Sequence, residues 1–230
     1  MQTYDFTKLL NTLHLKMNSI KLLEQAFLHR SYLNEVKQYM ESNERLEFLG
    51  DSVLSLVISF HLYLLRPKDN EGELTNLRAH IVKTVSLAKA SKKLELGQYL
   101  LLSKGEEISG GRENPQLLAN TYEALLGAIF IDQGFEKVKT VIGQTLLPFF
   151  EKELRTGPPK DAKSNLQEVV QQKFKQSPNY KILETRGPDH AKEFVVAVYV
   201  SGKEVGQGVG NSKQAAEEQA ARLALQSLIP

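Results

Sequence analysis

The chain has 230 residues with 29 basic and 27 acidic side chains, and its net charge of +2 is too small to indicate a nucleic-acid partner. The absence of cysteine excludes disulfides, thiolate-bound zinc and cysteine nucleophiles, and it fits a reducing cytoplasm. No apolar stretch approaches the roughly 18 residues that a membrane-spanning helix needs, and the N-terminus lacks the pattern of a secretory signal. We therefore expect a soluble, cytoplasmic protein with no membrane partner.

Helical spacing of apolar residues dominates the first two thirds of the chain. It predicts helices over 20–29, 43–65, 74–94, 116–131 and 135–154. Prolines and glycines separate these ranges, as expected at helix ends. No segment in this part has the convincing alternation of a β-strand. The pattern therefore predicts an all-helical domain over residues 1–155.

The helix predicted at 43–65 is unusual because it carries acids among apolar side chains. At about 100° per residue, Glu44, Glu47 and Asp51 share roughly one helical face. Burying like charges together is unfavourable unless a cation or hydrogen-bond donors neutralise them. The acids therefore indicate a divalent-metal site, and the alternative is a solvated acidic stripe on an amphipathic helix.

A second apolar helix, predicted at 116–131, presents Asn120 and Glu123 on one face because they are three residues apart. Two buried helices that both direct oxygen ligands inward would suit Mg²⁺, which binds carboxylates and retains water. The natural chemistry of such a centre is hydrolysis of a phosphodiester, in which the metal activates water and screens the developing charge.

A Gly-Pro-Pro sequence within 156–162 marks a linker, because these residues end a helix and favour an extended chain. Beyond it, residues 164–175 have helical spacing, and 193–200 are β-branched and aromatic, as in a strand. An alanine-rich helix follows Ser212, which is suited to be its N-cap. We therefore predict a small α-β-β-β-α domain over 163–230, and a chain that is mostly α overall.

Four segments together resemble one known family, bacterial ribonuclease III. Residues 43–52 read NERLEFLGDS, which looks like the signature of the family, and 71–78 (EGELTNLR) and 119–127 (ANTYEALLG) also fit it. The C-terminal region resembles a double-stranded-RNA-binding domain, and the two domains stand in the order that the family shows. The resemblance covers essentially the whole chain. It implies an all-helical ribonuclease III endonuclease domain followed by an RNA-binding domain.

The resemblance also implies a function. Members of this family are Mg²⁺-dependent endoribonucleases, in which Mn²⁺ can substitute, that cut double-stranded RNA to 5′-phosphate and 3′-hydroxyl products with short 3′ overhangs. They act as homodimers in the processing of ribosomal RNA precursors and messenger RNA. Glu47 and Asp51 match the metal-binding acids of the signature, and Glu123 matches the metal-bridging glutamate. Glu44 and Glu71 match further acids that line the cleavage cleft.

Other matches concern partner surfaces. Phe48 matches an aromatic that inserts into a socket on the partner subunit, and the alternative is a core residue of its own chain. Five residues of the C-terminal domain match positions that meet two successive minor grooves of a duplex and the phosphates between them. They are Gln167, Glu168, His190, Ser212 and Lys213. For His190 alone, a solvated loop histidine is the alternative.

Two positions depart from the family pattern. Asn120 stands where the family usually has a metal-binding aspartate, so one anion is missing and metal binding could lose on the order of 1–3 kcal/mol. Asn120 could be a tolerated ligand, a substitution that traps an uncut complex, or the mark of a regulator that binds RNA without cutting. We favour the first because the other acids all remain. Near Ser212 the family commonly has two or three basic residues, but here only Lys213 is basic, which predicts weaker binding and a shallower salt dependence.

Overall fold

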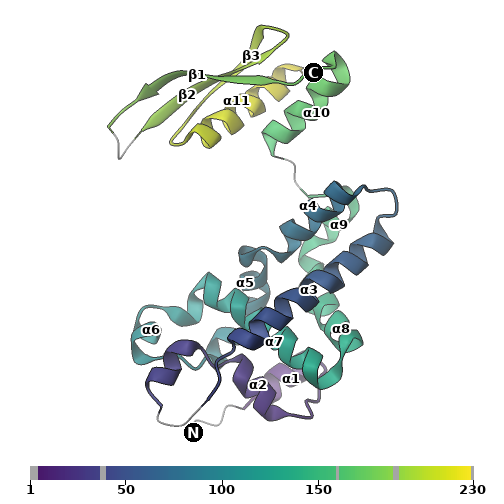
Figure 1. Ribbon diagram of the computed structural model, residues 1–230, viewed down its shortest axis with the longest axis vertical. Coiled ribbons are helices and arrows are strands. Elements are labelled where there is room, and N and C mark those ends of the chain that lie inside the picture. The colour runs from purple at the N-terminus through teal and green to yellow at the C-terminus, as the bar shows by residue number, and fades with distance from the viewer. Residues whose placement is uncertain (1–4, 37–39, 159–160, 189–191, 229–230) are drawn as a thin grey trace. The chain divides into compact units, whose positions relative to one another are not determined.

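The computed structural model of the chain describes residues 5–36, 40–158, 161–188 and 192–228. The chain divides into two compact units, residues 1–158 and 159–230 (Figure 1). The division falls inside the predicted linker at 156–162. The first unit is helical and the second combines helices with a sheet, as the sequence predicts.

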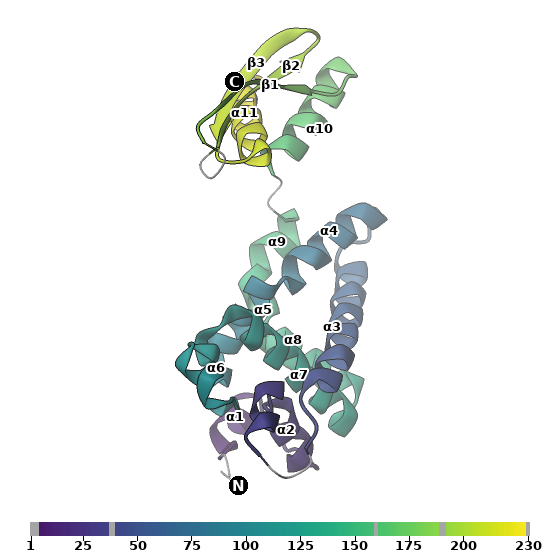
Figure 2. The ribbon, with the colours of Figure 1, turned by 60° about the vertical axis from the view of Figure 1, so that its left-hand side comes forward.

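The first unit is built around two long helices, α3 and α7, which pack together more extensively than any other pair (Figures 1 and 2). Its α-helices are α1 (Thr7–Thr12), α2 (Ile20–Ala26), α3 (Glu44–Leu65), α4 (Glu71–Val82), α5 (Thr84–Lys93), α6 (Lys104–Ile108), α7 (Pro115–Gln133), α8 (Phe135–Thr145) and α9 (Glu151–Thr156). Short 3₁₀ turns are η1 (Arg30–Asn34), η2 (Leu96–Tyr99), η3 (Gly111–Glu113) and η4 (Leu147–Phe150).

Two of the predicted helices are divided in the structure. The range 74–94 is two helices, α4 and α5, because Lys83 adopts an extended conformation with ψ of 149° between them. The range 135–154 is interrupted by η4, where Pro148 has no N–H to continue the hydrogen bonds of α8. Apolar spacing runs through both breaks, so periodicity alone does not reveal them.

The core of the first unit surrounds the α3–α7 pair. Tyr122 of α7 is fully buried, and its hydroxyl lies 2.6 Å from the Thr145 hydroxyl, so its polar atom is satisfied inside an apolar cluster. Leu54 and Ile58 of α3 and Leu126 of α7 are completely buried in the same cluster. Burial of this size fixes the position of one helix against the other.

Helix α3 corrects one expectation from the sequence. It is the one described helix that is long and apolar enough to cross a membrane by length and composition, with a mean hydropathy of 1.7. The expectation that no stretch approaches this length was therefore wrong, since scattered polar residues do not lower the average sufficiently. Such a helix is weak evidence for a membrane, because the core helix of a soluble protein has the same composition. Here α3 is the central helix of the first unit.

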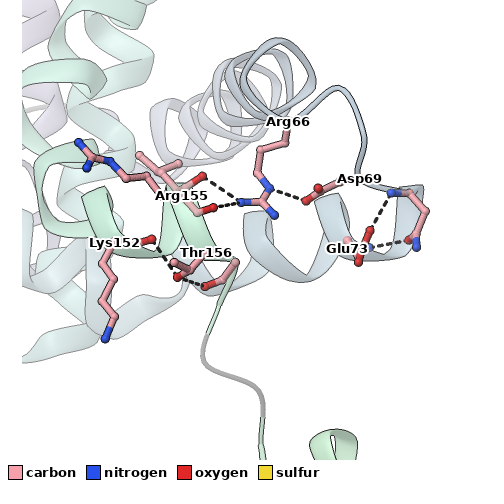
Figure 3. Close-up of polar contacts among 9 residues, drawn as sticks. Arg66, Asp69, Glu73, Lys152, Arg155 and Thr156 are labelled. Atoms are coloured by element: carbon pink, nitrogen blue, oxygen red, sulfur yellow. Dashed lines mark hydrogen bonds and ion pairs between the residues drawn. The ribbon is translucent and has the colours of Figure 1, made fainter. Parts of the chain in front are cut away.

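Arg66, just after α3, ties the last helix of the first unit to its core (Figure 3). Its guanidinium donates to the carbonyl oxygens of Leu154 and Arg155, at 3.1 and 2.8 Å, and pairs with Asp69. These contacts satisfy carbonyls at the end of α9 that have no partner within the helix. The chain therefore leaves the first unit from a fixed point at Thr156.

The second unit has the predicted α-β-β-β-α order. Its elements are α10 (Ala162–Phe174), β1 (Asn179–Arg186), β2 (Glu193–Val200), β3 (Lys203–Gly210) and α11 (Lys213–Leu228). The strands form one antiparallel sheet in the order β1-β2-β3, and α11 packs on β2 and β3 and against α10. Buried valines of β2 and alanines of α11 make a small core with Leu166 of α10.

Candidate active site

Two glycines bring α3 and α7 unusually close. A Cβ atom added at Gly50 would lie 1.8 Å from the backbone oxygen of Glu123, and one at Gly127 would lie 2.2 Å from the backbone oxygen of Leu46. Any larger residue at either position would therefore hold the helices apart. Gly50 immediately precedes Asp51, so this close approach brings the acids of α3 next to those of α7.

The carboxylates at the crossing influence one another, as a shared site requires. We call Glu47, Asp51 and Glu123 the α3–α7 acid cluster. Burial, followed by the charges of Asp51 and Glu47, raises the pKa of Glu123 to about 7. Burial and the charge of Glu44 also raise the pKa of Glu47, and a hydrogen bond from the Asn120 side chain opposes the increase.

This arrangement argues against the solvated stripe for part of the cluster. Glu47 and Glu123 are partly buried, whereas Asp51 and Glu44 are exposed. Glu44 accepts a hydrogen bond of 2.8 Å from the Ser42 hydroxyl and lies 3.7 Å from the Arg30 guanidinium. Glu44 is thus a partnered acid at the rim, and of the cluster only Glu47 and Glu123 extend inward.

The chemistry of the donor set fits a divalent cation. Among the described residues, no group of three or more histidine, cysteine, aspartate or glutamate side chains already has the spacing of a metal centre. The ion pairs that join described residues do not include any member of the α3–α7 acid cluster. Crowded carboxylates without a cationic partner are ligands that Mg²⁺ prefers, and the ion would offset both the burial and the carboxylate repulsion that raise the pKa of Glu123.

Asn120 belongs to the same site through its amide. Its Oδ1 accepts a hydrogen bond of 2.7 Å from Nε2 of Gln116, one turn earlier on α7. Asn114 fixes the start of this helix by accepting hydrogen bonds from the backbone N–H groups of Gln116 and Leu117, at 2.9 and 3.4 Å, and Pro115 occupies the first helical position. These signals at the N-terminus set the register in which Gln116, Asn120 and Glu123 face α3.

A cleft of about 420 Å³ opens beside the cluster. Its lining includes Glu44, Glu47, Gln116 and Asn120, together with His29 and Arg30 from the segment before α3. The sequence analysis did not identify Gln116, His29 or Arg30. The spacing of four residues between Gln116 and Asn120 was a signal for the first, but no local pattern connects 29–30 with α7.

Glu71 does not join the α3–α7 acid cluster of its own chain. A single chain therefore does not place it in the cleavage cleft, where the sequence comparison predicts it. It is the first residue of α4, is exposed, and accepts a hydrogen bond of 3.2 Å from the Thr75 hydroxyl. Helix α3 separates it from Glu47, and the 18 residue-to-residue steps from Glu47 to Leu65 span about 27 Å at the usual helical rise.

Phe48 is 79% exposed, so the alternative of a core residue within the same chain is wrong. It lies next to Glu47 but points away from the core of the first unit. An exposed aromatic ring of this size is the kind of residue that anchors a protein interface.

In the second unit, the predicted RNA-contacting residues are accessible. Gln167 and Glu168 are exposed on α10, and Lys213 is the exposed first residue of α11. The Ser212 hydroxyl accepts a hydrogen bond of 3.2 Å from the backbone N–H of Ala215, which fits the predicted N-cap. His190 lies outside the described residues.

Comparisons with known proteins agree with both units. Residues 19–149 match the model of the Ribonuclease-III-like family, and residues 162–228 match the double-stranded RNA binding motif. Ribonuclease 3 of Geobacillus thermodenitrificans is 46% identical over 224 residues, which is 97% of this chain and 91% of the relative. Ribonuclease 3 of Geobacillus sp. strain WCH70 is 50% identical over 209 residues, or 90% of this chain and 85% of the relative.

Among solved structures, the nuclease domain of ribonuclease III from Campylobacter jejuni is similar to the first unit. It is 39% identical with a TM-score of 0.60, and the match covers 65% of this chain and 99% of that domain. A second structure of that domain, with a TM-score of 0.59 and 40% identity over 64% of this chain and 99% of that domain, concerns a flexible region involved in dimer formation. These likenesses give no support to a regulator that binds without cutting. Both units match along nearly their whole length, and the chain therefore belongs to the ribonuclease III family of endonucleases that act on double-stranded RNA.

Proposed function

We propose that the α3–α7 acid cluster binds Mg²⁺, or Mn²⁺ in its place, and that the enzyme hydrolyses each strand of an RNA duplex to 5′-phosphate and 3′-hydroxyl ends with short 3′ overhangs. The observation that carries this proposal is the crowding of Glu47, Asp51 and Glu123 at a glycine-mediated helix crossing without a cationic partner among the described residues. Such a crossing is costly to build unless a ligand uses it.

The protein's own residues supply position and charge. Glu47, Asp51 and Glu123 would hold the cation from two helices, and Glu44 extends the negative rim towards the cleft. When bound, Mg²⁺ would lower the pKa of water and offset negative charge on the phosphate. Glu47 and Glu123 are partly buried, where the effective dielectric constant is lower, so their attraction for a bound cation is stronger there than in open solvent.

A homodimer is part of the proposal, because α3 exposes an apolar face. Four of its exposed residues lie within about 100° of one another around the helix. They are Leu56, Phe60, Tyr63 and Leu64, with exposed fractions of 57, 43, 69 and 62%. Phe48 adds an exposed ring near the other end of the helix. The related Campylobacter domain has a region involved in dimer formation, which supports the same arrangement here.

A two-fold axis near the middle of α3 would give Glu71 a role. The end of one α3, which leads into α4 and Glu71, would then lie beside the acid-bearing end of the other. Glu71 of one protomer would thus line the cleft of its partner, although it is distant from the cluster of its own chain.

Dimer formation has a direct test in sedimentation velocity. Phe48→Ala should raise the dimer dissociation constant at least tenfold, because loss of a buried aromatic anchor typically costs about 2 kcal/mol or more and about 1.4 kcal/mol is a factor of ten. Phe174→Ala is the matched control, since Phe174 is an exposed ring of α10 in the second unit. If the dissociation constant of Phe48→Ala is unchanged, Phe48 does not lie in the interface. If the parent chain is monomeric, the proposed dimer is wrong.

The second unit would select duplex over single-stranded RNA, and structured precursors of ribosomal and messenger RNA are the proposed substrates. A single Lys213 at the start of α11 offers few phosphate contacts, so binding should depend only shallowly on salt. A steep decline in duplex affinity between low and physiological salt would contradict this expectation.

The experiment that tests the proposed function is cleavage of an end-labelled RNA duplex of about 30 base pairs, long enough for the roughly 16 base pairs that such a domain spans. The parent chain should cut with Mg²⁺ and not with EDTA, and it should leave 5′-phosphate ends. Asn120→Asp should cut with a lower Mg²⁺ requirement because it adds a carboxylate. Cutting in EDTA would overturn the metal site. Binding without cutting by the parent, with activity only in Asn120→Asp, would overturn the activity proposed for this chain.

A further inference from the structure

Gln116 and Asn120 form an amide pair beside the α3–α7 acid cluster. The neighbours of Asn120 determine which end of its amide, oxygen or nitrogen, faces each of them. Glu47 is a carboxylate and can only accept hydrogen bonds, so the group that Asn120 turns towards it must be the donor Nδ2. The Oδ1 atom of Asn120 then faces away from Glu47. It accepts the 2.7 Å hydrogen bond from Nε2 of Gln116. With Oδ1 engaged by Gln116, the Nδ2 donor is the end of the Asn120 amide that is left for Glu47, which lines the same cleft.

We propose that Gln116 is a positioning residue, which holds Asn120 with Nδ2 towards Glu47 and so makes Asn120 a hydrogen-bond donor to a metal-binding carboxylate instead of an oxygen ligand. The inference rests on the metal site of the proposed function. It gives residue 120 a different task from that of an acid at the same position. An acid contributes a charge to the cation, whereas Asn120 orients the carboxylate that binds the cation.

The location of Gln116 permits this role. It is exposed in the first turn of α7, where the Asn114 cap and Pro115 define the backbone, and it lines the same cleft as Asn120 and Glu47. A glutamine is long enough to reach one helical turn along α7, and its amide can donate to an oxygen acceptor. Because Gln116 is exposed and the cap uses backbone groups, changing its side chain should leave the fold intact.

The positioning role of Gln116 predicts whether Mn²⁺ binds more weakly or more tightly when the amide is removed. Gln116→Met keeps the length of the side chain but removes its amide, so Asn120 would lose the partner that orients it. If Asn120 orients Glu47, Mn²⁺ binding measured without RNA by electron paramagnetic resonance should weaken about threefold to tenfold, as expected for one hydrogen bond. If Asn120 were an oxygen ligand, freeing Oδ1 from Gln116 would instead strengthen Mn²⁺ binding.

The Asn120→Asp variant tests whether Gln116 affects the metal site through Asn120. The two oxygens of a carboxylate are equivalent, so an aspartate at position 120 has no wrong orientation and does not need Gln116. In Asn120→Asp, the further change Gln116→Met should therefore alter the Mn²⁺ dissociation constant by less than about twofold. Gln144→Met is the matched control, because Gln144 is exposed on α8 away from the cleft.

The metal-free readout is the side-chain ¹⁵NH₂ signal of Asn120. It should shift in Gln116→Met and stay unchanged in Gln144→Met. Tighter or unchanged Mn²⁺ binding by Gln116→Met, or an equal loss in both backgrounds, would overturn the positioning role and leave the metal site in place. If no variant binds Mn²⁺ but the ¹⁵NH₂ signal responds as expected, the metal site is overturned, and with it the effect of Gln116 on metal binding. The hydrogen bond between Gln116 and Asn120 would still stand.

Discussion

The α3–α7 crossing and the β3–α11 contact bring backbones together by the same means but with opposite electrostatic results. In the first unit, Gly50 and Gly127 let two helices touch, and the residues drawn together include three carboxylates. In the second unit, a Cβ atom at Gly208 of β3 would lie 2.3 Å from the backbone nitrogen of Ala220 on α11, and the surroundings are buried alanines and valines. One close approach concentrates charge, and the other buries only apolar surface.

The difference shows what each contact is for. A small unit has limited apolar surface to bury, so close packing of glycine against alanine increases the stability that its core can supply. The α3–α7 crossing has a large core around it and does not need the carboxylates for stability. Burial of these carboxylates, followed by their mutual repulsion, opposes folding, as the raised pKa of Glu123 indicates, and the acids are retained at a position where a cation would reverse the effect.

The largest expected effect follows from separating the two helices. Gly50→Ala places a Cβ atom 1.8 Å from the Glu123 backbone oxygen, and the overlap should cost about 3 kcal/mol of unfolding free energy or more. Mn²⁺ binding should be lost as well, because the two halves of the site move apart. Urea unfolding and metal titration measure the two effects.

Gly143→Ala is the control for this prediction. It is also a glycine within a helix, α8, but nothing lies within 4 Å of its added Cβ atom. Alanine there should stabilise the protein by about 1 kcal/mol through helix propensity alone. Equal responses of Gly50→Ala and Gly143→Ala would show that the crossing does not depend on glycine.

The second expected effect is confined to the other unit. Gly208→Ala should destabilise the second unit by about 2 kcal/mol, a large share of the stability of a small domain, while the first unit keeps its melting temperature. Gln207→Ala, its exposed neighbour on β3, should change little. Separate thermal transitions followed by NMR test this result, and a decline in the melting temperature of both units would contradict the independence of the two contacts.

The acids of the candidate site could be picked out from the sequence, but the packing that brings them together could not. Acids inside an apolar helix are a local pattern, and both Glu47 and Glu123 were found from it. Gly50 and Gly127 lie within the same segments, but their role depends on a partner helix about 75 residues away in the chain, which helix periodicity does not reveal. For the same reason, the sequence did not reveal how far Glu71 lies from the acid cluster of its own chain, because distances between segments do not depend on one segment alone.

In the second unit, the element order was predictable because strand and helix patterns are local, and the N-cap at Ser212 follows from residue type. The strand β1 was not located individually. Most of its residues are exposed, so it lacks the burial pattern that made β2 recognisable. Similarly, the division of α4 from α5 at Lys83 depends on one extended residue that interrupts an otherwise continuous apolar pattern.

The smallest expected effect is electrostatic and concerns the charge at the first crossing. Glu123 has a pKa of about 7 in the fold against an ordinary value of 4.5, so the folded state binds more protons than the unfolded state between these values. Its favourable contribution is complete below the unfolded pKa and is lost as pH rises through the folded pKa. In EDTA, stability should therefore decline between about pH 5 and pH 8.

Glu123→Gln should remove much of this decline, because glutamine has no proton to lose. At about pH 8 the variant should be more stable than the parent in EDTA by on the order of 1 kcal/mol, a figure reduced for partial exposure. Added Mg²⁺ should stabilise the parent and not the variant, and the variant should bind duplex RNA without cutting it. Glu151→Gln, an exposed acid on α9, is the control. If the parent and Glu123→Gln lose stability equally as pH rises, then the charges at the α3–α7 crossing do not oppose folding, and the contrast with β3–α11 reduces to geometry alone.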